Sequence, residues 1–451
     1  MRRFAGALPW LVTAIALGAI AVWPWYVRSS ANAARAASLP TAAPVDADYR
    51  LRDRQIAFWE GAMGQHERGD MLSPAQLSAL YLQRYRERGD VGDVLRAVHT
   101  AQLSLRAQPF GNTAAEVDLA SALLTLHRFS DALSVTHHIE RYDPNDPQML
   151  AREASLDLEL GHYDRAHRLI DQVERTRPSG SDGIAVDTLL TRYDELTGHL
   201  TRGRDRFART VADANAIYGE SAQGRAWFYF RAGELAFEAG DNDAALADER
   251  RALEVFPDYS EANRLLARFS CALHRWNDCL AAAQASAQVV PFPEVLGYEV
   301  DAQRALGQTA QAAQTDALIQ TVERIGNAQH IADRLLAIYY DEHDENLDDA
   351  YRIAHRELDV RDDVFTEDTL AWAAARDGRW DEARSRIARA MTYGTQNSLL
   401  LYHDGIIAIH FGDRARARRD LSEALALNPW FHPFYVGDAR AQLAMLATTR
   451  K

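Results

Sequence analysis

The stretch GELAFEAGDNDAALADERRALEVFP, residues 233–257, decides the fold. Its composition predicts two helices, and Gly240 near the middle predicts the turn between them, because glycine readily adopts the left-handed conformation that ends a helix. Asp241 or Asp243 is then expected to cap the second helix. Pro257 ends that helix because proline lacks the N–H that would continue it. The stretch therefore predicts one helical hairpin.

The small residues of this hairpin recur along the chain at a spacing of 34 positions. If Ala226 is position 1, then Gly233 is position 8, Ala245 position 20 and Ala252 position 27. Two helices approach to the lower end of about 8–10 Å where the facing side chains are small. The residues expected to pack in this way are Ala132, Ala154, Ala166, Gly233, Ala245, Ala252, Ala267, Ala371, Ala383, Gly405, Ala417 and Ala424.

This frame, with proline at position 32, resembles the tetratricopeptide repeat, a helix–turn–helix unit of 34 residues. The units that keep it without gaps are 147–180, 226–259, 260–293, 364–397 and 398–431. The resemblance implies an all-α, right-handed superhelical solenoid of about nine or ten repeats over residues 75–431. It also implies that the array acts by binding other proteins.

Three further segments flank the array. Residues 29–48, SSANAARAASLPTAAPVDAD, are small and contain proline, which predicts a flexible linker. A leading helix within residues 49–74 and a C-terminal helix within residues 432–451 are expected to cap the array. Such caps are needed because a terminal repeat has no neighbour to cover its apolar face.

Residues 1–28 predict a membrane anchor or a signal segment. Leu8 to Val27 carries no charge over 20 residues. At about 1.5 Å per residue this helix would span the bilayer core of about 30 Å. The small-x-small sequences at 31–33 and 34–36 leave cleavage as the alternative. The array would then lie in the periplasm, either anchored to a bacterial-type inner membrane or released as a periplasmic or secreted protein.

Charge and motifs exclude several functions. A net charge of -14 argues against nucleic-acid binding, which requires a basic surface. No nucleotide-binding, zinc-protease or nucleophile-elbow motif occurs, so we expect no enzyme and no cofactor. The acidic loop at 339–349 resembles a calcium loop in part, but Asp349 and His355 stand where glycine and glutamate are needed. We expect a solvated turn there, and a metal-dependent enzyme is the remote alternative.

The chain has two cysteines, Cys271 and Cys279, at positions 12 and 20 of one unit. If position 20 lies opposite position 8, position 12 is one helical turn, about 5.4 Å, further along. With a helix separation of about 8–10 Å, the two Cα atoms would be about 10 Å apart, beyond the roughly 7 Å limit for a bridge. We therefore expect two buried, unpaired cysteines.

By resemblance to the repeat family, positions 2, 5, 9, 12 and 13 face a concave groove. The groove residues are then Trp227, Phe230, Glu234, Phe237, Arg264, Arg268, Tyr402 and Ile406. Two interpretations remain open. The aromatic rings form an apolar groove for an extended peptide or helix, or a neighbouring unit covers them. The lysine–asparagine clamp with which some family members hold a peptide C-terminus is missing here.

The sequence thus favours a membrane-anchored, periplasm-facing scaffold that binds other proteins, with the membrane contacted through residues 8–27. The alternative is a spacer or oligomerisation component of a cell-envelope assembly or transport system. A homo-oligomer is possible, and a defined oligomer without a free groove would favour the alternative, whereas a monomer that captures another protein would favour the scaffold. The sequence does not identify the partner.

Overall fold

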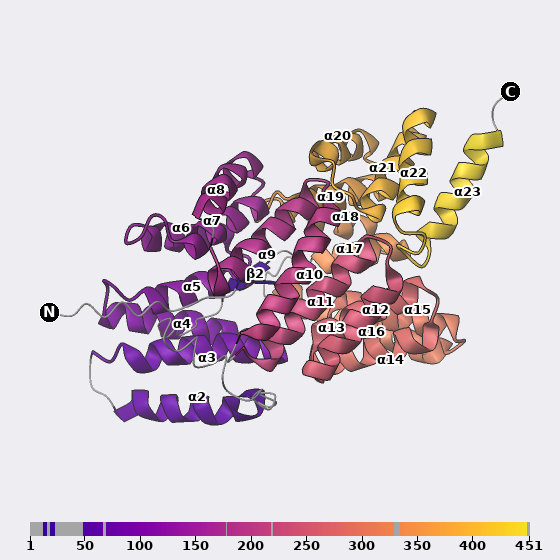
Figure 1. The fold of residues 1–451 in the computed structure, drawn as a ribbon. Coiled ribbons are helices and arrows are strands. Elements are labelled where there is room, and N and C mark those ends of the chain that lie inside the picture. The colour runs from indigo at the N-terminus through magenta and orange to yellow at the C-terminus, as the bar shows by residue number, and fades with distance from the viewer. Residues whose placement is uncertain are drawn as a thin grey trace. The chain divides into compact units, whose positions relative to one another are not determined.

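The computed structural model describes residues 48–65, 69–176, 178–217, 220–328 and 334–448, and the backbone of residues 12–15 and 19–22. Apart from two short strands, the described residues form helices joined by turns (Figure 1). They divide into two compact units. The first comprises Met1–Thr191, Arg206–Phe228 and Val255–Pro257, and the second Arg192–Asp205, Tyr229–Glu254 and Asp258–Lys451.

The first unit is a row of helices in which α2 packs on α3, α3 on α4 and α4 on α5 (Figure 1). Ile56, Leu77 and Val94 are buried in one apolar cluster between the first three of them. Its helices are α2 (Asp48–Gln65), α3 (Leu72–Arg88), α4 (Val91–Ala107), α5 (Thr113–Thr125), α6 (Phe129–Glu140), α7 (Pro147–Glu159), α8 (Tyr163–Thr176), and parts of α9 (Gly180–Leu196), α10 (Leu200–Ala216) and α11 (Ala222–Glu238).

The second unit continues with the remaining parts of α9 to α11. One of its apolar clusters includes Tyr340, Ile353 and Leu370. Its other elements are α12 (Asn242–Val255), α13 (Ser260–Ala272), α14 (Trp276–Val289), α15 (Pro293–Ala305), α16 (Thr309–Ala328), α17 (Arg334–His343), α18 (Leu347–Glu357), α19 (Val364–Arg376), α20 (Trp380–Ala390), the 3-10 turn η1 (Met391–Tyr393), α21 (Ser398–His410), α22 (Arg414–Leu427) and α23 (Tyr435–Thr448).

The hairpin predicted from residues 233–257 is formed by α11 and α12. Gly240 lies between them in the left-handed region, with φ at 78°. Asp241 caps α12 by accepting a hydrogen bond from the backbone N–H of Ala244 at 3.2 Å. Two other hairpins place a histidine at the glycine position, His127 and His274, each with φ at 56°. The turn conformation is therefore kept even where glycine is absent.

Small residues lie inside the hairpins, with position 8 facing position 24. A Cβ atom added at Gly233 would collide with the Glu249 carboxylate and lie 3.1 Å from the Ala245 carbonyl oxygen. One added at Gly405 would lie 2.7 Å from Leu421 Cγ. Both glycines are buried. The alanines of the predicted packing set are at most 1% exposed, namely Ala132, Ala154, Ala166, Ala245, Ala252, Ala267, Ala371, Ala383, Ala417 and Ala424.

The expected anchor helix at residues 8–27 does not appear in the part of it that the structure describes. There, β1 (Val12–Ile15) and β2 (Ala19–Val22) pair antiparallel, with Val12 opposite Val22. The other residues of the expected anchor, and the linker up to residue 47, lie outside the described residues. None of the helices described is both long enough and apolar enough to cross a membrane.

Candidate functional site

The predicted groove residues of α11 lie in both units, and their aromatic rings are buried. Trp227, in the first unit, is 2% exposed. Its ring meets those of Phe207 and Phe228 edge to face, with centroids 6.0 and 5.0 Å away. Trp227 therefore belongs to an aromatic core in this structure rather than to an open surface.

Phe230 and Phe237, in the second unit, are covered by the next hairpin. Phe230 packs edge to face on Tyr259, with ring centroids 5.9 Å apart. Phe237 stacks on Phe269 of α13, with centroids 4.3 Å apart. Both phenylalanines are at most 1% exposed. Their burial agrees with the interpretation in which a neighbouring repeat covers these rings.

The charged residues of the predicted groove form ion pairs between adjacent first helices. Arg268 Nη2 lies 3.1 Å from Glu238 Oε1. Arg264 pairs with Glu261 at 2.9 Å and with Glu294 of α15 at 3.0 Å. Burial lowers the pKa of Arg268, but Glu238 and the other acidic groups around it together outweigh burial, so the pKa is raised. These guanidinium groups are neutralised within the chain.

Glu234 completes this network from α11, where it pairs with Arg231. Arg231 also pairs with Glu195 at the end of α9. Burial lowers the pKa of Arg231, but the two carboxylates outweigh it and the pKa is raised. Carboxylates and guanidinium groups therefore alternate along the first helices of the second unit.

At the other end of the array, Tyr402 is covered by a later part of the chain. Its ring stacks on that of Tyr435, with centroids 4.7 Å apart, and it is 3% exposed. Its hydroxyl donates to Asp438 Oδ2 at 2.8 Å. Burial, and then the Asp438 carboxylate, raise the pKa of Tyr402. Ile406, one turn further along α21, is half-buried.

The segment that covers Tyr402 is residues 428–438, NPWFHPFYVGD, which we name the C-terminal strap. Asn428 donates from Nδ2 to the carbonyl oxygen of Phe237 at 2.7 Å. His432 Nε2 lies 3.1 Å from Glu342 Oε1 of α17. The strap therefore contacts α11, α17 and α21, which are first helices of their repeats.

The 34-residue pattern does not predict the strap, because it ends before these residues and indicates only a capping helix within residues 432–451. The available signal was composition: the strap holds four aromatic residues and two prolines within 11 positions. Such a segment is too apolar for an exposed linker. Its place on α11, α17 and α21 depends on contacts far apart in the sequence.

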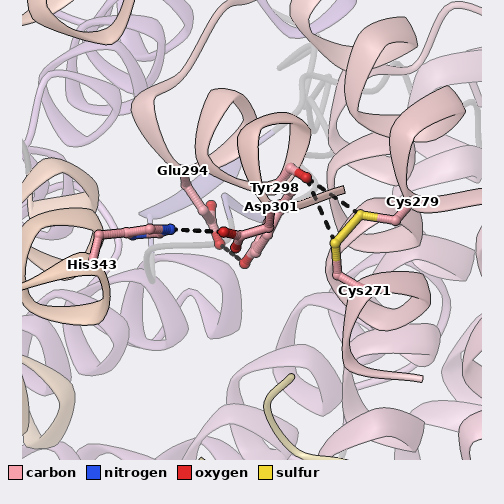
Figure 2. The surroundings of a disulfide bond; sticks show 6 residues. All are labelled: Cys271, Cys279, Glu294, Tyr298, Asp301 and His343. Carbon is pink, nitrogen blue, oxygen red and sulfur yellow. Dashed lines mark hydrogen bonds and ion pairs between the residues drawn. A yellow bond between two sulfur atoms is a disulfide. The ribbon is translucent and has the colours of Figure 1, made fainter. Parts of the chain in front are cut away.

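Cys271 and Cys279 form a disulfide, so the prediction of two unpaired cysteines is wrong (Figure 2). Their Cα atoms are 5.1 Å apart. The error lay in the register of the hairpin. Ala267 packs with Ala283, so position 8 faces position 24 and position 12 faces position 20. This register places Cys271 opposite Cys279.

Helix α15 joins this disulfide to α17. Both sulfur atoms lie within 3.7 Å of the carbonyl oxygen of Tyr298, and the Tyr298 hydroxyl donates to Glu294 at 2.7 Å (Figure 2). One turn on, Asp301 Oδ1 lies 2.9 Å from His343 Nε2. Burial lowers the pKa of His343, but Asp301 outweighs it and raises the pKa to about 9.

The acidic loop at 339–349 is only partly the solvated turn that the sequence predicts. Asp341 lies in α17 and is 1% exposed, and burial raises its pKa well above the usual value. Asp344 is in the turn and pairs with Arg376 of α19. This carboxylate of the acidic loop is thus already paired with a guanidinium group.

Among the described residues, His137, Glu140 and Glu153 lie close enough together to hold a metal ion. Arg165 pairs with Glu153 and lies 2.8 Å from His137 Nε2. Because this guanidinium already supplies a positive charge, the cluster is explained as an ion-pair network.

No protein-family model matches the sequence, and no curated protein matches it. Several solved structures are similar. PilW, a widely conserved type IV pilus biogenesis factor, is 19% identical over 46% of this chain and 91% of its own, with a TM-score of 0.38. Yeast Tom70 is 12% identical over 89% and 94%, with a TM-score of 0.36. A Rap protein complexed with competence and sporulation factor is 13% identical over 74% and 97%, with a TM-score of 0.40. Similarities of this size do not show whether these proteins and this chain share a function.

Proposed function

We propose that this chain is an exported scaffold that binds other proteins through its array of helical hairpins. The observation that carries the proposal is the series of helical hairpins, which is found in each of the two units with buried small residues inside the hairpins. Stacked hairpins present a long continuous surface, and proteins built in this way bind partners along it. The frame of 34 positions supports placing the array in the tetratricopeptide repeat class.

Partner capture tests this role. The full chain, tagged at its C-terminus, is cross-linked in cells and purified from detergent-solubilised membranes. We expect a discrete partner to be recovered in a constant ratio to the chain. Replacing Trp227 or Phe230 would test folding rather than binding, because both side chains are buried. Repeated recovery of the chain alone would overturn the proposal.

Export and anchoring are supported by two features of the chain. The uncharged run at residues 8–27 has the length of a membrane-spanning helix. The Cys271–Cys279 disulfide suits an oxidising compartment, where such bonds persist. We therefore propose that the array faces the periplasm, with residues 8–27 in the inner membrane or removed as a signal.

Protease treatment of spheroplasts that express the full chain tests this location. Digestion of the array before lysis is the expected result, since a periplasmic array is accessible once the outer membrane is opened. An array that is digested only after lysis would contradict export. Sequencing the N-terminus of the mature chain then distinguishes an anchor from a cleaved signal.

The alternative role, an oligomerisation component, is favoured by one surface feature. Leu51 and Phe58 lie seven residues apart on α2 and are 49% and 66% exposed. This spacing places both side chains on one face of the helix. Analytical ultracentrifugation of the detergent-solubilised chain would show a defined oligomer that Phe58→Glu dissociates. A monomer would contradict the alternative.

A further inference from the structure

A buried guanidinium group of the first unit has one edge without a partner. Arg152 of α7 is 1% exposed, and its Nη1 donates to Ser121 Oγ of α5 at 3.1 Å. Ser121 in turn donates to the carbonyl oxygen of Val117 at 2.8 Å, which fixes the hydroxyl. Among the residues that the structure describes, no group accepts a hydrogen bond from Nε or Nη2 of Arg152. The guanidinium group is therefore oriented from one side and unsatisfied on the other.

The unsatisfied edge of Arg152 has the geometry that recognises a carboxylate. Nε and Nη2 carry parallel N–H bonds, and the two oxygen atoms of a carboxylate accept them as a bidentate pair. A buried charged group rarely lacks such a partner, because burial removes it from water. The orientation of Arg152 therefore indicates a ligand with a carboxylate group.

The acidic residue that acts most strongly on Arg152, Asp118, does not satisfy this edge. Asp118 lies on α5, 34 positions before Arg152, so the two occupy the same position in consecutive repeats. Its Oδ1 also lacks a partner among the described residues. Burial lowers the pKa of Arg152 to about 9, and Asp118 offsets this only in part. Because burial also raises the pKa of Asp118 well above its usual value, Asp118 is a poor counter-ion for Arg152.

We propose that Arg152 binds the carboxylate of a ligand, with Nε and Nη2 donating to its two oxygen atoms while Ser121 holds Nη1. The carboxylate belongs either to a free small acid or to an acidic side chain of a partner protein. In the second case the inference rests on the proposed function, because it gives the scaffold a point of recognition.

Access to this site involves the strand β2, which packs on α5 and α7. β2 belongs to residues 8–27, and the proposed function places these residues in the membrane or has them removed. Departure of β2 then opens a route to the buried edge of Arg152.

Two probes with a single carboxylate test the proposal on the full chain in detergent micelles. They are acetate and the tripeptide acetyl-alanyl-glutamyl-alanyl amide, and binding is measured by saturation-transfer difference NMR. We expect the unsubstituted chain to bind at least the tripeptide and to ignore its glutamine analogue, which has no carboxylate. A tripeptide affinity at least tenfold above that of acetate assigns the site to a protein side chain, whereas equal affinities assign it to free acids.

Substitution of Arg152 gives the second arm. Arg152→Lys keeps the positive charge but has no bidentate edge, so the affinity for the bound probe should fall about tenfold or more. Arg168→Lys, the same change at an exposed position of α8, is the matched control and should bind as the unsubstituted chain does. The proposal is overturned if neither probe binds the unsubstituted chain, or if Arg152→Lys keeps both its helical circular dichroism and its affinity.

Hydrogen exchange on the unsubstituted chain keeps the proposal falsifiable if Arg152→Lys does not fold. At a probe concentration of about ten times its dissociation constant, protection of backbone amides in α5 and α7 should rise about tenfold. Unchanged protection in these two helices would overturn the proposal. A chain that captures a partner in cells but binds neither probe keeps the proposed function and loses this inference.

Discussion

At the residue scale, the pairing of positions across a hairpin decides what each side chain can do. Position 12 faces position 20, which allows Cys271 and Cys279 to bond. Position 8 faces position 24, so glycine at 405 leaves room for Leu421. In this hairpin the glycine at position 8 therefore makes room for the larger leucine at position 24.

Reduction of the disulfide should destabilise the second unit. The bond closes a loop with a sequence separation of 8 residues. The loop-closure entropy that such a bond removes from the unfolded chain corresponds to about 2–3 kcal/mol of stability. Urea unfolding of the full chain should therefore shift to lower concentration when a reductant is added. The Cys271→Ala/Cys279→Ala variant is the control, and an equal shift in it would contradict this role of the bond.

The His343–Asp301 pair should make stability depend on pH. His343 Nδ1 lies 2.8 Å from the Tyr339 carbonyl oxygen and Nε2 faces Asp301, so both ring nitrogens face acceptors and the charged form is favoured. With a folded pKa of about 9 against 6.5 in the unfolded chain, the stabilisation is complete below pH 6.5 and is lost as pH rises through about 9.

The measurement is the unfolding free energy of the unsubstituted chain minus that of His343→Gln between pH 6 and 9.5. This difference should fall by about 1–3 kcal/mol across the range. The subtraction removes the contribution of other titrating groups. Parallel curves for the two proteins would show that His343 carries no such stabilisation.

At the element scale, glycine turns have two roles that the sequence alone does not separate. Gly240 and Gly378 both occupy position 15 and have φ at 78° and 79°. A Cβ atom at Gly240 would collide with the Leu427 carbonyl oxygen, whereas one at Gly378 would meet nothing within 4 Å. Of these two turns, the one at Gly240 is in close contact with a distant hairpin and the one at Gly378 is not.

Gly240→Ala should therefore destabilise the chain more than Gly378→Ala. Both changes place a side chain in the left-handed region, at a cost of about 1 kcal/mol. Gly240→Ala adds the displacement of the Leu427 backbone, for which overpacking costs of about 1–3 kcal/mol are usual. Thermal unfolding of the two variants side by side measures the difference. Equal loss of stability would show that the backbone at Leu427 moves freely.

The hairpins could be predicted from the sequence because the residues that specify each one lie within a single repeat. The turn at Gly240, the cap at Asp241 and the small residues inside the hairpins follow from neighbours a few residues away. The burial of the predicted groove residues could not be obtained in this way. The Tyr402 ring is covered by that of Tyr435, and the Phe237 carbonyl oxygen accepts a hydrogen bond from the Asn428 side chain. No periodic pattern in the sequence specifies such pairs.

At the scale of a whole unit, the second unit departs from a simple solenoid. In an ideal solenoid each repeat contacts only its neighbours, so stability is lost in order from the ends. Here Thr395 donates to the carbonyl oxygen of Leu196, 199 residues away in the chain, at 2.6 Å. Asn397 donates to Glu238 at 2.6 Å. These two bonds join the loop that precedes α21 to α9 and α11. The last repeats therefore cannot unfold independently of α9 and α11.

Removing these long-range bonds should loosen both segments that they join. In the Thr395→Ala/Asn397→Ala variant, each buried hydrogen bond lost costs about 1–2 kcal/mol. Hydrogen exchange should therefore rise at residues 194–199 and 236–241 as well as at 391–400. Thr392→Ala is the matched control, because its hydroxyl bonds only to Ala388 in the preceding helix. Faster exchange confined to 391–400 in the double variant would mean that the late repeats hold together without the early ones, as in a solenoid of independent neighbours.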